Sequence, residues 1–97
     1  MDITEAVKRY LDISWEDPDT DLQVEDTITS AMARINDHAG VEVDLTSDTL
    51  AFQLFKDCCR YIWNKVLDEF EKNYASELIA LRNKYMVEAY EKEESTV

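Results

Sequence analysis

The sequence predicts an all-α protein that folds as a compact bundle of about four helices. Three observations lead to this class: apolar residues recur at helical spacing, the chain has one Gly and one Pro, and 45% of its 97 residues are apolar. The turns of an all-β fold need many more Gly and Pro residues. We therefore expect a single helical domain over residues 1–97, with a polar tail over about 92–97 that frays.

The first helix is expected over residues 3–11. Asp2 precedes it as an N-cap residue, and Glu5 stands three positions later, where a capping box has its acidic partner. The apolar residues of this segment fall on one side, as in a helix that packs on a core: Ile3, Ala6, Val7, Tyr10 and Leu11.

The second helix is expected over residues 21–39, with Thr20 and Gln23 as its capping box. Gly40 follows it directly, and Gly readily adopts the left-handed conformation that ends many helices. The apolar residues again form a stripe on one face: Val24, Ile28, Ala31, Met32, Ile35 and Ala39.

Residues 41–45 alternate between apolar and acidic side chains, which is the pattern of a strand. No second strand is predicted for it to pair with, so we expect an extended loop. The third helix is expected over residues 48–70. Its apolar and aromatic residues cover most of its circumference, which predicts a long central aromatic helix that is buried on several sides.

The fourth helix is expected over residues 75–92 and carries two apolar stripes. The first stripe, which suits the core of the domain, comprises Tyr74, Leu78, Leu81, Tyr85 and Ala89. The second is displaced by roughly 120° around the helix and comprises Ile79, Met86 and Tyr90. This second stripe predicts either wider burial within the chain or an interface with a partner or a second copy.

The segment between the first two helices, ISWEDPDTD, contains an Asp-x-Asp-x-Asp pattern over residues 17–21 with which a calcium loop could begin. Such a loop needs Gly at its sixth position and Glu at its twelfth, but Leu22 and Ile28 stand there. We therefore favour a joint between two helices, whose acids stabilise the positive end of the second helix. Trp15 is expected to fold back onto the apolar sides of both helices.

No catalytic or metal-binding arrangement of residues is recognisable, so we expect a protein that is not an enzyme and needs no cofactor or metal. His38 stands alone near the end of the second helix, where a cation suits the helix dipole. Cys58 and Cys59 are adjacent, and on a helix their side chains point about 100° apart. They are expected to be reduced thiols of the core.

The net charge of −12 is distributed unevenly. Residues 1–48 contain 13 acids and 3 bases, whereas residues 49–97 contain 9 acids and 7 bases. Such a surface repels nucleic acid and anionic membranes. The sequence has no apolar stretch of about 18 residues and shows no signal peptide. We therefore expect a cytoplasmic protein.

Three stretches carry a family resemblance: YLDISWEDPDTD, LQVEDTITSAMARINDHAG and YIWNKVLDEFEKNYASELIAL. In them the sequence resembles the small all-helical head–tail connector proteins of long-tailed bacteriophages and prophages, also called adaptor, head-completion or DNA-packaging proteins. The resemblance extends over nearly the whole chain. It consists of residue types and spacings rather than of a catalytic motif.

The resemblance implies a structural role in virion assembly. Connector subunits form a homo-oligomeric ring of about a dozen copies under the portal protein, extend the DNA channel, and provide a docking platform for neck and tail completion proteins. The C-terminal segment commonly engages the portal, although the tail EKEESTV is short for that task. The expected location is the bacterial host cytoplasm during assembly and then the virion neck.

Two sets of residues become candidates for this role. Ile79, Met86 and Tyr90 are candidates for a partner or oligomer interface. The acids of the joint and the second helix are candidates for the channel surface, since DNA that slides through should not bind its walls: Glu16, Asp17, Asp19, Asp21, Glu25 and Asp26. The alternative that these acids form a solvated face outside the ring stays open, because a run of charge does not fix its own direction.

A function of a different class is a small acidic regulatory protein that imitates DNA and occupies the basic site of a partner. The acidity of residues 1–48 favours this alternative. The clustering of acids at one joint does not, because a DNA mimic spreads its acids at phosphate-like spacing over one face. Salt-sensitive binding to a basic nuclease or repressor would distinguish the two functions.

Overall fold

The computed structural model describes residues 2–95, with side chains for residues 2–91. Within this range the chain forms five helices and no strand: α1 (Ile3–Tyr10), α2 (Pro18–Ala39), α3 (Thr49–Trp63), α4 (Leu67–Asn73) and α5 (Ala75–Ser95). The predicted all-α class is confirmed, whereas the predicted number of four helices is too low by one. None of these helices combines the length and the apolar character that a crossing of the lipid bilayer requires.

Three of the helices begin at an aspartate whose carboxylate accepts a backbone hydrogen bond from the first turn: Asp2, Asp17 and Asp48. The predicted cap at Asp2 is confirmed. The predicted start of the second helix at residue 21 is wrong, because Asp17 rather than Thr20 is its N-cap. The helix then begins at Pro18, whose missing N–H costs nothing in the first turn.

The predicted third helix over residues 48–70 is in fact two helices, α3 and α4. Lys65, in the turn between them, has a left-handed backbone with φ of 61°. The N–H of Val66 donates to the C=O of Tyr61 at 2.9 Å, which closes the end of α3 as in a Schellman motif. The apolar pattern runs through this turn without a Gly or Pro, so the sequence does not mark the break.

The loop after α2 follows the prediction. Gly40 ends the helix with a left-handed φ of 79°. The expected extended loop is confirmed, since residues 41–45 form no strand. Its side chains Val43 and Leu45 are buried, and the N–H of Val43 donates to the Asn36 side chain at 2.9 Å. The second half of the strand-like alternation therefore reflects a loop that turns Val43 and Leu45 into the core, whereas Val41 stays exposed.

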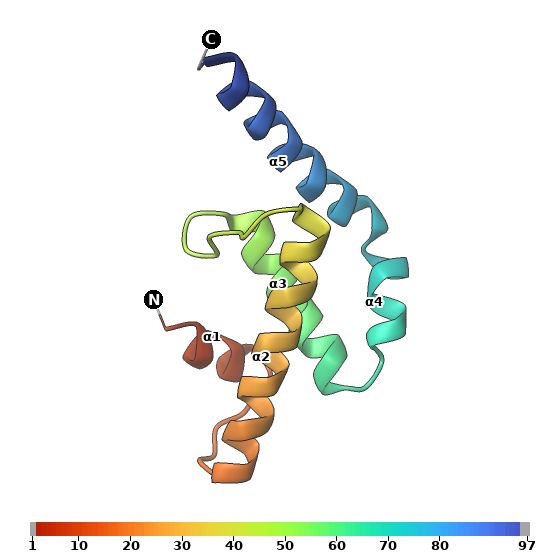
Figure 1. Ribbon diagram of the computed structural model, residues 1–97. Helices are drawn as coiled ribbons and strands as arrows, with labels where there is room; N and C mark the ends of the chain where they lie inside the picture. The colour runs from red at the N-terminus through yellow and green to blue at the C-terminus, as the bar shows by residue number, and fades with distance from the viewer. Residues whose placement is uncertain (1, 96–97) are drawn as a thin grey trace.

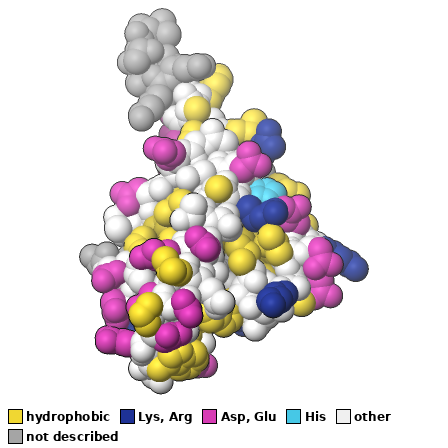
Figure 2. All heavy atoms as spheres, turned by 60° about the horizontal axis from the view of Figure 1, so that its bottom comes forward, with side chains coloured by type: hydrophobic (Ala, Val, Ile, Leu, Met, Phe, Trp, Pro, Cys, Tyr) yellow, Lys and Arg dark blue, Asp and Glu magenta, His cyan; other side chains and the backbone are white. Residues whose placement is uncertain are grey.

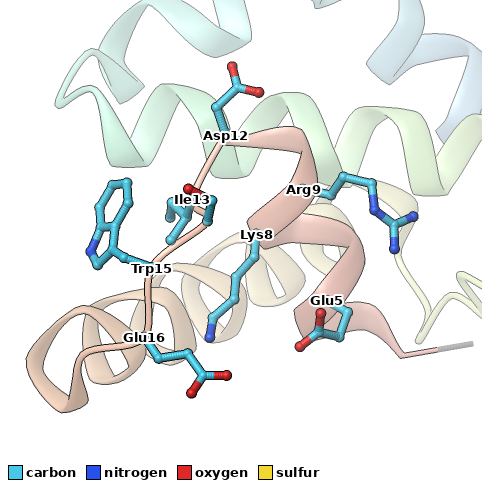
Figure 3. Close-up of a pocket in the computed structure, with 8 residues that line it drawn as sticks. Glu5, Lys8, Arg9, Asp12, Ile13, Trp15 and Glu16 are labelled. Atoms are coloured by element: carbon cyan, nitrogen blue, oxygen red, sulfur yellow. The ribbon is translucent and has the colours of Figure 1, made fainter.

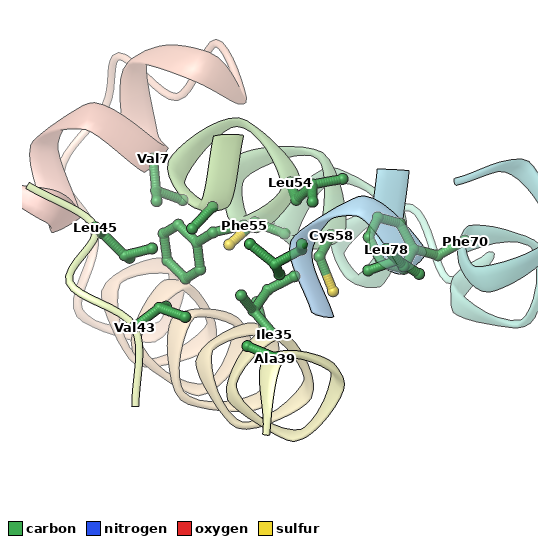
Figure 4. Packing of buried hydrophobic residues seen from close by; sticks show 14 of the residues in the cluster. Val7, Ile35, Ala39, Val43, Leu45, Leu54, Phe55, Cys58, Phe70 and Leu78 are labelled. Atoms are coloured by element: carbon green, nitrogen blue, oxygen red, sulfur yellow. The ribbon is translucent and has the colours of Figure 1, made fainter. Parts of the chain in front are cut away.

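Helix α3 is the centre of the fold, as predicted for the aromatic third helix. It is in contact with each of the other four described helices. Figure 4 shows Phe55 of α3 among side chains from α1, α2 and the loop after α2, while Phe70 and Leu78 extend the buried cluster to α4 and α5. One continuous core thus joins all five helices.

Helix α5 leaves this core partway along its length (Figure 1). Leu78 and Leu81 are buried and Tyr85 is half-buried, but every residue from Met86 to Glu91 is exposed. The helix continues to Ser95, past the predicted end at residue 92. The fraying expected over residues 92–97 stays a prediction, and residues 96–97 lie outside the described part of the chain. The molecule is elongated, with principal extents of 53 × 29 × 17 Å.

Candidate functional site

The first candidate surface is formed by the α1–α2 joint and the first turns of α2, residues 14–26, and is called here the acidic edge. Figure 2 shows Asp and Glu side chains gathered at this end of the molecule around exposed hydrophobic side chains. The acidic edge itself contains two large exposed hydrophobic residues, Trp15, which is 53% exposed, and Leu22, which is 60% exposed. The acidic edge therefore combines negative charge with apolar surface.

The expected burial of Trp15 against helices α1 and α2 is wrong. Ile13 fills the buried position of the joint. The preceding residue, Asp12, has a left-handed backbone with φ of 60°, which turns the chain at the end of α1. The indole N–H of Trp15 donates to the Thr20 hydroxyl at 3.3 Å, and the ring stays on the surface.

Four of the six predicted acids lie on the acidic edge with exposed side chains and without an ion pair inside the described range: Glu16, Asp19, Glu25 and Asp26. The other two have structural partners. Asp17 accepts hydrogen bonds from the backbone and hydroxyl of Thr20 at 3.2 and 3.0 Å. Asp21 lies 2.6 Å from Lys8 Nζ, and this contact raises the pKa of Lys8.

The joint interpretation of the Asp-x-Asp-x-Asp pattern is confirmed by these contacts. Asp17 caps α2 and Asp21 pairs with α1, so the two carboxylates serve different helices. The side chains of residues 2–91 contain no group of three or more His, Cys, Asp or Glu residues that could hold a metal ion.

A hollow of about 520 Å³ lies between α1 and the joint (Figure 3). Its lining contains acids, bases and one exposed aromatic ring: Glu5, Lys8, Arg9, Asp12, Trp15 and Glu16. Because both signs of charge occur within one turn of helix, the hollow does not select an ion of either sign. Its largest apolar element, Trp15, belongs to the acidic edge.

The second candidate surface, called here the α5 surface, is the exposed apolar side of α5. It consists of residues whose side chains are between 55% and 62% exposed: Ile79, Met86, Val87 and Tyr90. Three of them were predicted from the second apolar stripe. Val87 was missed because it lies one position off that stripe. It is nevertheless an apolar residue directly after Met86, and this could have marked it in the sequence.

A buried carboxylate fixes the point where α5 leaves the core. Asp48 caps α3 and also accepts hydrogen bonds from the Tyr85 hydroxyl at 2.5 Å and from Lys84 Nζ at 3.0 Å. Burial alone would raise the pKa of Asp48, but the hydrogen bonds from Ala51, Tyr85 and Lys84 outweigh it and lower that pKa. Sequence reasoning missed this contact, which holds the start of the projecting segment of α5 against α3.

The remaining reactive side chains contribute to the fold. Burial raises the pKa of Cys58 to about 11 and that of Cys59 to about 12, so both thiols stay protonated at neutral pH. His38 Nε2 lies 3.4 Å from Glu71 Oε1, which also pairs with Arg34 at 3.2 Å. These contacts tie α2 to α4.

No protein-family model, no curated protein and no solved structure matches the chain. The features that bear on function are therefore the acidic edge and the α5 surface. Figure 1 places them at opposite ends of the molecule, since α2 begins at one end and α5 extends from the other. A molecule with two unlike surfaces at opposite ends can make two different contacts at the same time.

Proposed function

We propose that this chain is a head–tail connector subunit of a long-tailed bacteriophage or prophage. In this role it forms a homo-oligomeric ring of about a dozen copies under the portal protein. The ring extends the DNA channel and provides a docking platform for neck and tail completion proteins. The subunit acts first in the bacterial host cytoplasm and then in the virion neck, and it catalyses no reaction.

The observation that carries this proposal is the exposed segment of α5. A short helix without tertiary contacts is marginal in water, because its formation costs backbone entropy that packing normally offsets. Here that segment also exposes Met86, Val87 and Tyr90. Clustered apolar side chains on a projecting element are typical of a surface that binds another protein. The portal protein is the partner proposed for this helix.

The separation of the two candidate surfaces supports a ring on the portal, because α5 can engage the portal while the acidic edge contacts a neighbouring copy. In a head-to-tail contact each subunit uses two unlike surfaces, and such contacts close into rings when the rotation between subunits is suitable. A chain with a net charge of −12 also suits a channel wall that DNA passes without binding. We place exposed acids from the α2 part of the acidic edge, Glu25 and Asp26, on or near that wall.

The second candidate function, a small acidic regulatory protein or DNA mimic, is favoured by one observation. The acidic edge presents Trp15 and Leu22 among its acids, and a basic protein with an apolar pocket would complement both features. This function predicts salt-sensitive binding to a basic partner through the acidic edge, with the α5 surface unused. The connector function predicts that both surfaces are needed.

The connector function is tested by mixing the chain with the portal protein encoded beside it and imaging the product by electron microscopy. We expect an added ring of density on the portal. The double variant Met86→Glu, Tyr90→Glu should lose that ring, because charged side chains cannot be buried in the contact. The control is Glu88→Gln, which lies about 200° around the helix from Met86 and should assemble normally. Unchanged assembly by the double variant would refute the role of α5.

A further inference from the structure

A cluster of cations on aromatic rings lies where α1 crosses α3, and is called here the cation–aromatic face. Lys56 Nζ is 5.2 Å from the centroid of the Tyr10 ring and 4.8 Å from that of Phe52. The Arg60 guanidinium is 5.9 Å from the Tyr10 ring and 5.6 Å from the Tyr61 ring. Lys56 and Arg60 thus lie over three half-buried rings, and Arg9 lines the same groove as a third cation.

In the described part of this acidic protein, the cations of this face form no ion pair, although the pKa of Arg60 is raised, against the opposing effect of burial, in part by the nearby charge of Asp57. The chain has 22 acids and 10 bases, yet Arg9, Lys56 and Arg60 form no ion pair within the described residues. A groove of about 460 Å³ on this face contains no carboxylate in its lining, which consists of Ala6, Arg9, Tyr10, Phe52 and Lys56.

The carboxylates nearest to the face are directed elsewhere. Asp57 lies beneath it and is buried, where it accepts hydrogen bonds from the Tyr10 hydroxyl and from Gln53. Glu5 and Asp12 line the hollow on the other side of Arg9, and Glu69 lines a shallow hollow next to Arg60. None of these three makes an ion pair with the cations of the face. The face is therefore open to an acidic ligand that also offers apolar contact.

We propose that the cation–aromatic face receives the acidic edge of a second copy of this chain. This inference rests on the proposed function, because it supplies the contact between neighbouring subunits of the ring. The acidic edge offers unpaired carboxylates, including Glu16 and Asp19, together with the exposed ring of Trp15. Arg and Lys side chains bind both carboxylates and aromatic faces, so the two surfaces complement each other in charge and in chemistry.

A second copy fits the face better than a nucleic acid does. Binding to a phosphate backbone depends on many positive charges, and its strength falls steeply with salt. Three cations on a chain with a net charge of −12 cannot overcome the repulsion of a polyanion at physiological salt. The acidic edge, in contrast to a nucleic acid, is a compact negative patch of limited charge, and every copy of the chain carries it.

The test exchanges the charges of the two surfaces. The face variant carries Lys56→Glu and Arg60→Glu, and the edge variant carries Glu16→Lys and Asp19→Lys. Each variant alone should form the ring on the portal only at a protein concentration at least about tenfold higher than wild type needs. A tenfold change corresponds to a loss of about 1.4 kcal/mol in the free energy of association. An equimolar mixture should recover assembly, because each variant then offers the surface that the other requires. Lys72→Glu, on an exposed part of α4, is the control and should assemble as wild type does.

Each outcome separates this inference from the proposed function. If wild type forms no ring on the portal, the connector function fails first. If wild type assembles and the face variant assembles equally well, or if the mixture recovers nothing, the inferred contact is wrong while the connector function stands. Binding of a single-stranded oligonucleotide by wild type that the face variant loses would also overturn it. Circular dichroism confirms that every variant is folded, and a disulfide between Glu16→Cys and Lys56→Cys copies provides a second readout.

Discussion

Two buried carboxylates determine where helices at the two ends of the chain meet α3. Asp48 binds the hydroxyl of Tyr85 on α5, and Asp57 binds the hydroxyl of Tyr10 on α1. Burial, together with the hydrogen bond to the carboxylate, raises the pKa of each tyrosine to about 12. Both tyrosines therefore remain protonated donors at any physiological pH. The directions in which α1 and α5 leave the centre depend on these two contacts.

The variant Asp48→Ala should lower the free energy of unfolding by about 2–3 kcal/mol. It removes the N-cap of α3 and leaves Tyr85 and Lys84 without their acceptor. Asp48→Asn should cost less, because asparagine still caps the helix. Urea denaturation at neutral pH measures both values, and equal losses for the two variants would contradict the capping role.

The charge of Asp48 should make its contribution depend on pH. Its pKa in the folded protein lies below the ordinary value of 3.8. A carboxyl with a depressed pKa contributes stability that is fully present above 3.8 and is lost as the pH falls through the lower folded-state value. The difference in unfolding free energy between wild type and Asp48→Asn should therefore shrink on acidification. A difference that stays constant down to about pH 2 would show that the charge is irrelevant.

At the residue scale, the sequence predicted contacts between residues that are close together in the chain. The caps at Asp2 and Gly40 were predicted because helix caps involve residues within one turn. The contact between Asp48 and Tyr85 joins residues 37 positions apart, and helical periodicity gives no information on which distant element a carboxylate meets. The burial of Trp15 was wrongly predicted for a related reason. The joint has one buried apolar position, and Ile13 rather than Trp15 occupies it.

At the scale of elements, the break between α3 and α4 determines the course of the second half of the chain. Lys65 adopts φ of 61°, a conformation that costs a side-chain-bearing residue roughly 1–2 kcal/mol. Natural helix ends of this kind usually have Gly, and here a lysine stands in its place. The helices on either side pack well enough to hold it, with Phe70 of α4 fully buried.

The variant Lys65→Gly should raise the free energy of unfolding by about 0.5–1 kcal/mol, because glycine adopts the left-handed conformation without strain. The matched control is Asn64→Gly at the neighbouring position, where φ is −88° and glycine only adds freedom to the unfolded chain. That control should lower stability. Thermal or urea unfolding of the two variants measures the contrast, and destabilisation by both would show that the turn tolerates lysine without strain.

The types of the elements were predictable and their ends were not. Apolar periodicity identified every helical segment, because the core needs one face of each helix. The same periodicity runs unbroken from Trp63 to Phe70, so it could not reveal that the chain turns at Lys65. The start of α2 at Pro18 was missed because two residues three positions apart, Asp17 and Thr20, are both of a type that caps helices.

At the scale of the molecule, the candidate surfaces follow from how five helices share one core. Periodicity predicted that Ile79, Met86 and Tyr90 lie off the first stripe of α5. It could not show that the helix leaves the body of the molecule after Tyr85 (Figure 1). The position of the α3 cations Lys56 and Arg60 over the Tyr10 ring of α1 was likewise invisible in the sequence, because it depends on how two helices cross.

The central claim is that a partner protein binds the projecting part of α5. Hydrogen–deuterium exchange of the amides of residues 86–91 tests this claim most directly. In the free chain these amides should exchange rapidly, since no core contact holds this part of the helix. In complex with the portal they should become strongly protected, while the amides of α3 change little. Strong protection in the free chain, or exchange that the portal leaves unchanged, would contradict the account.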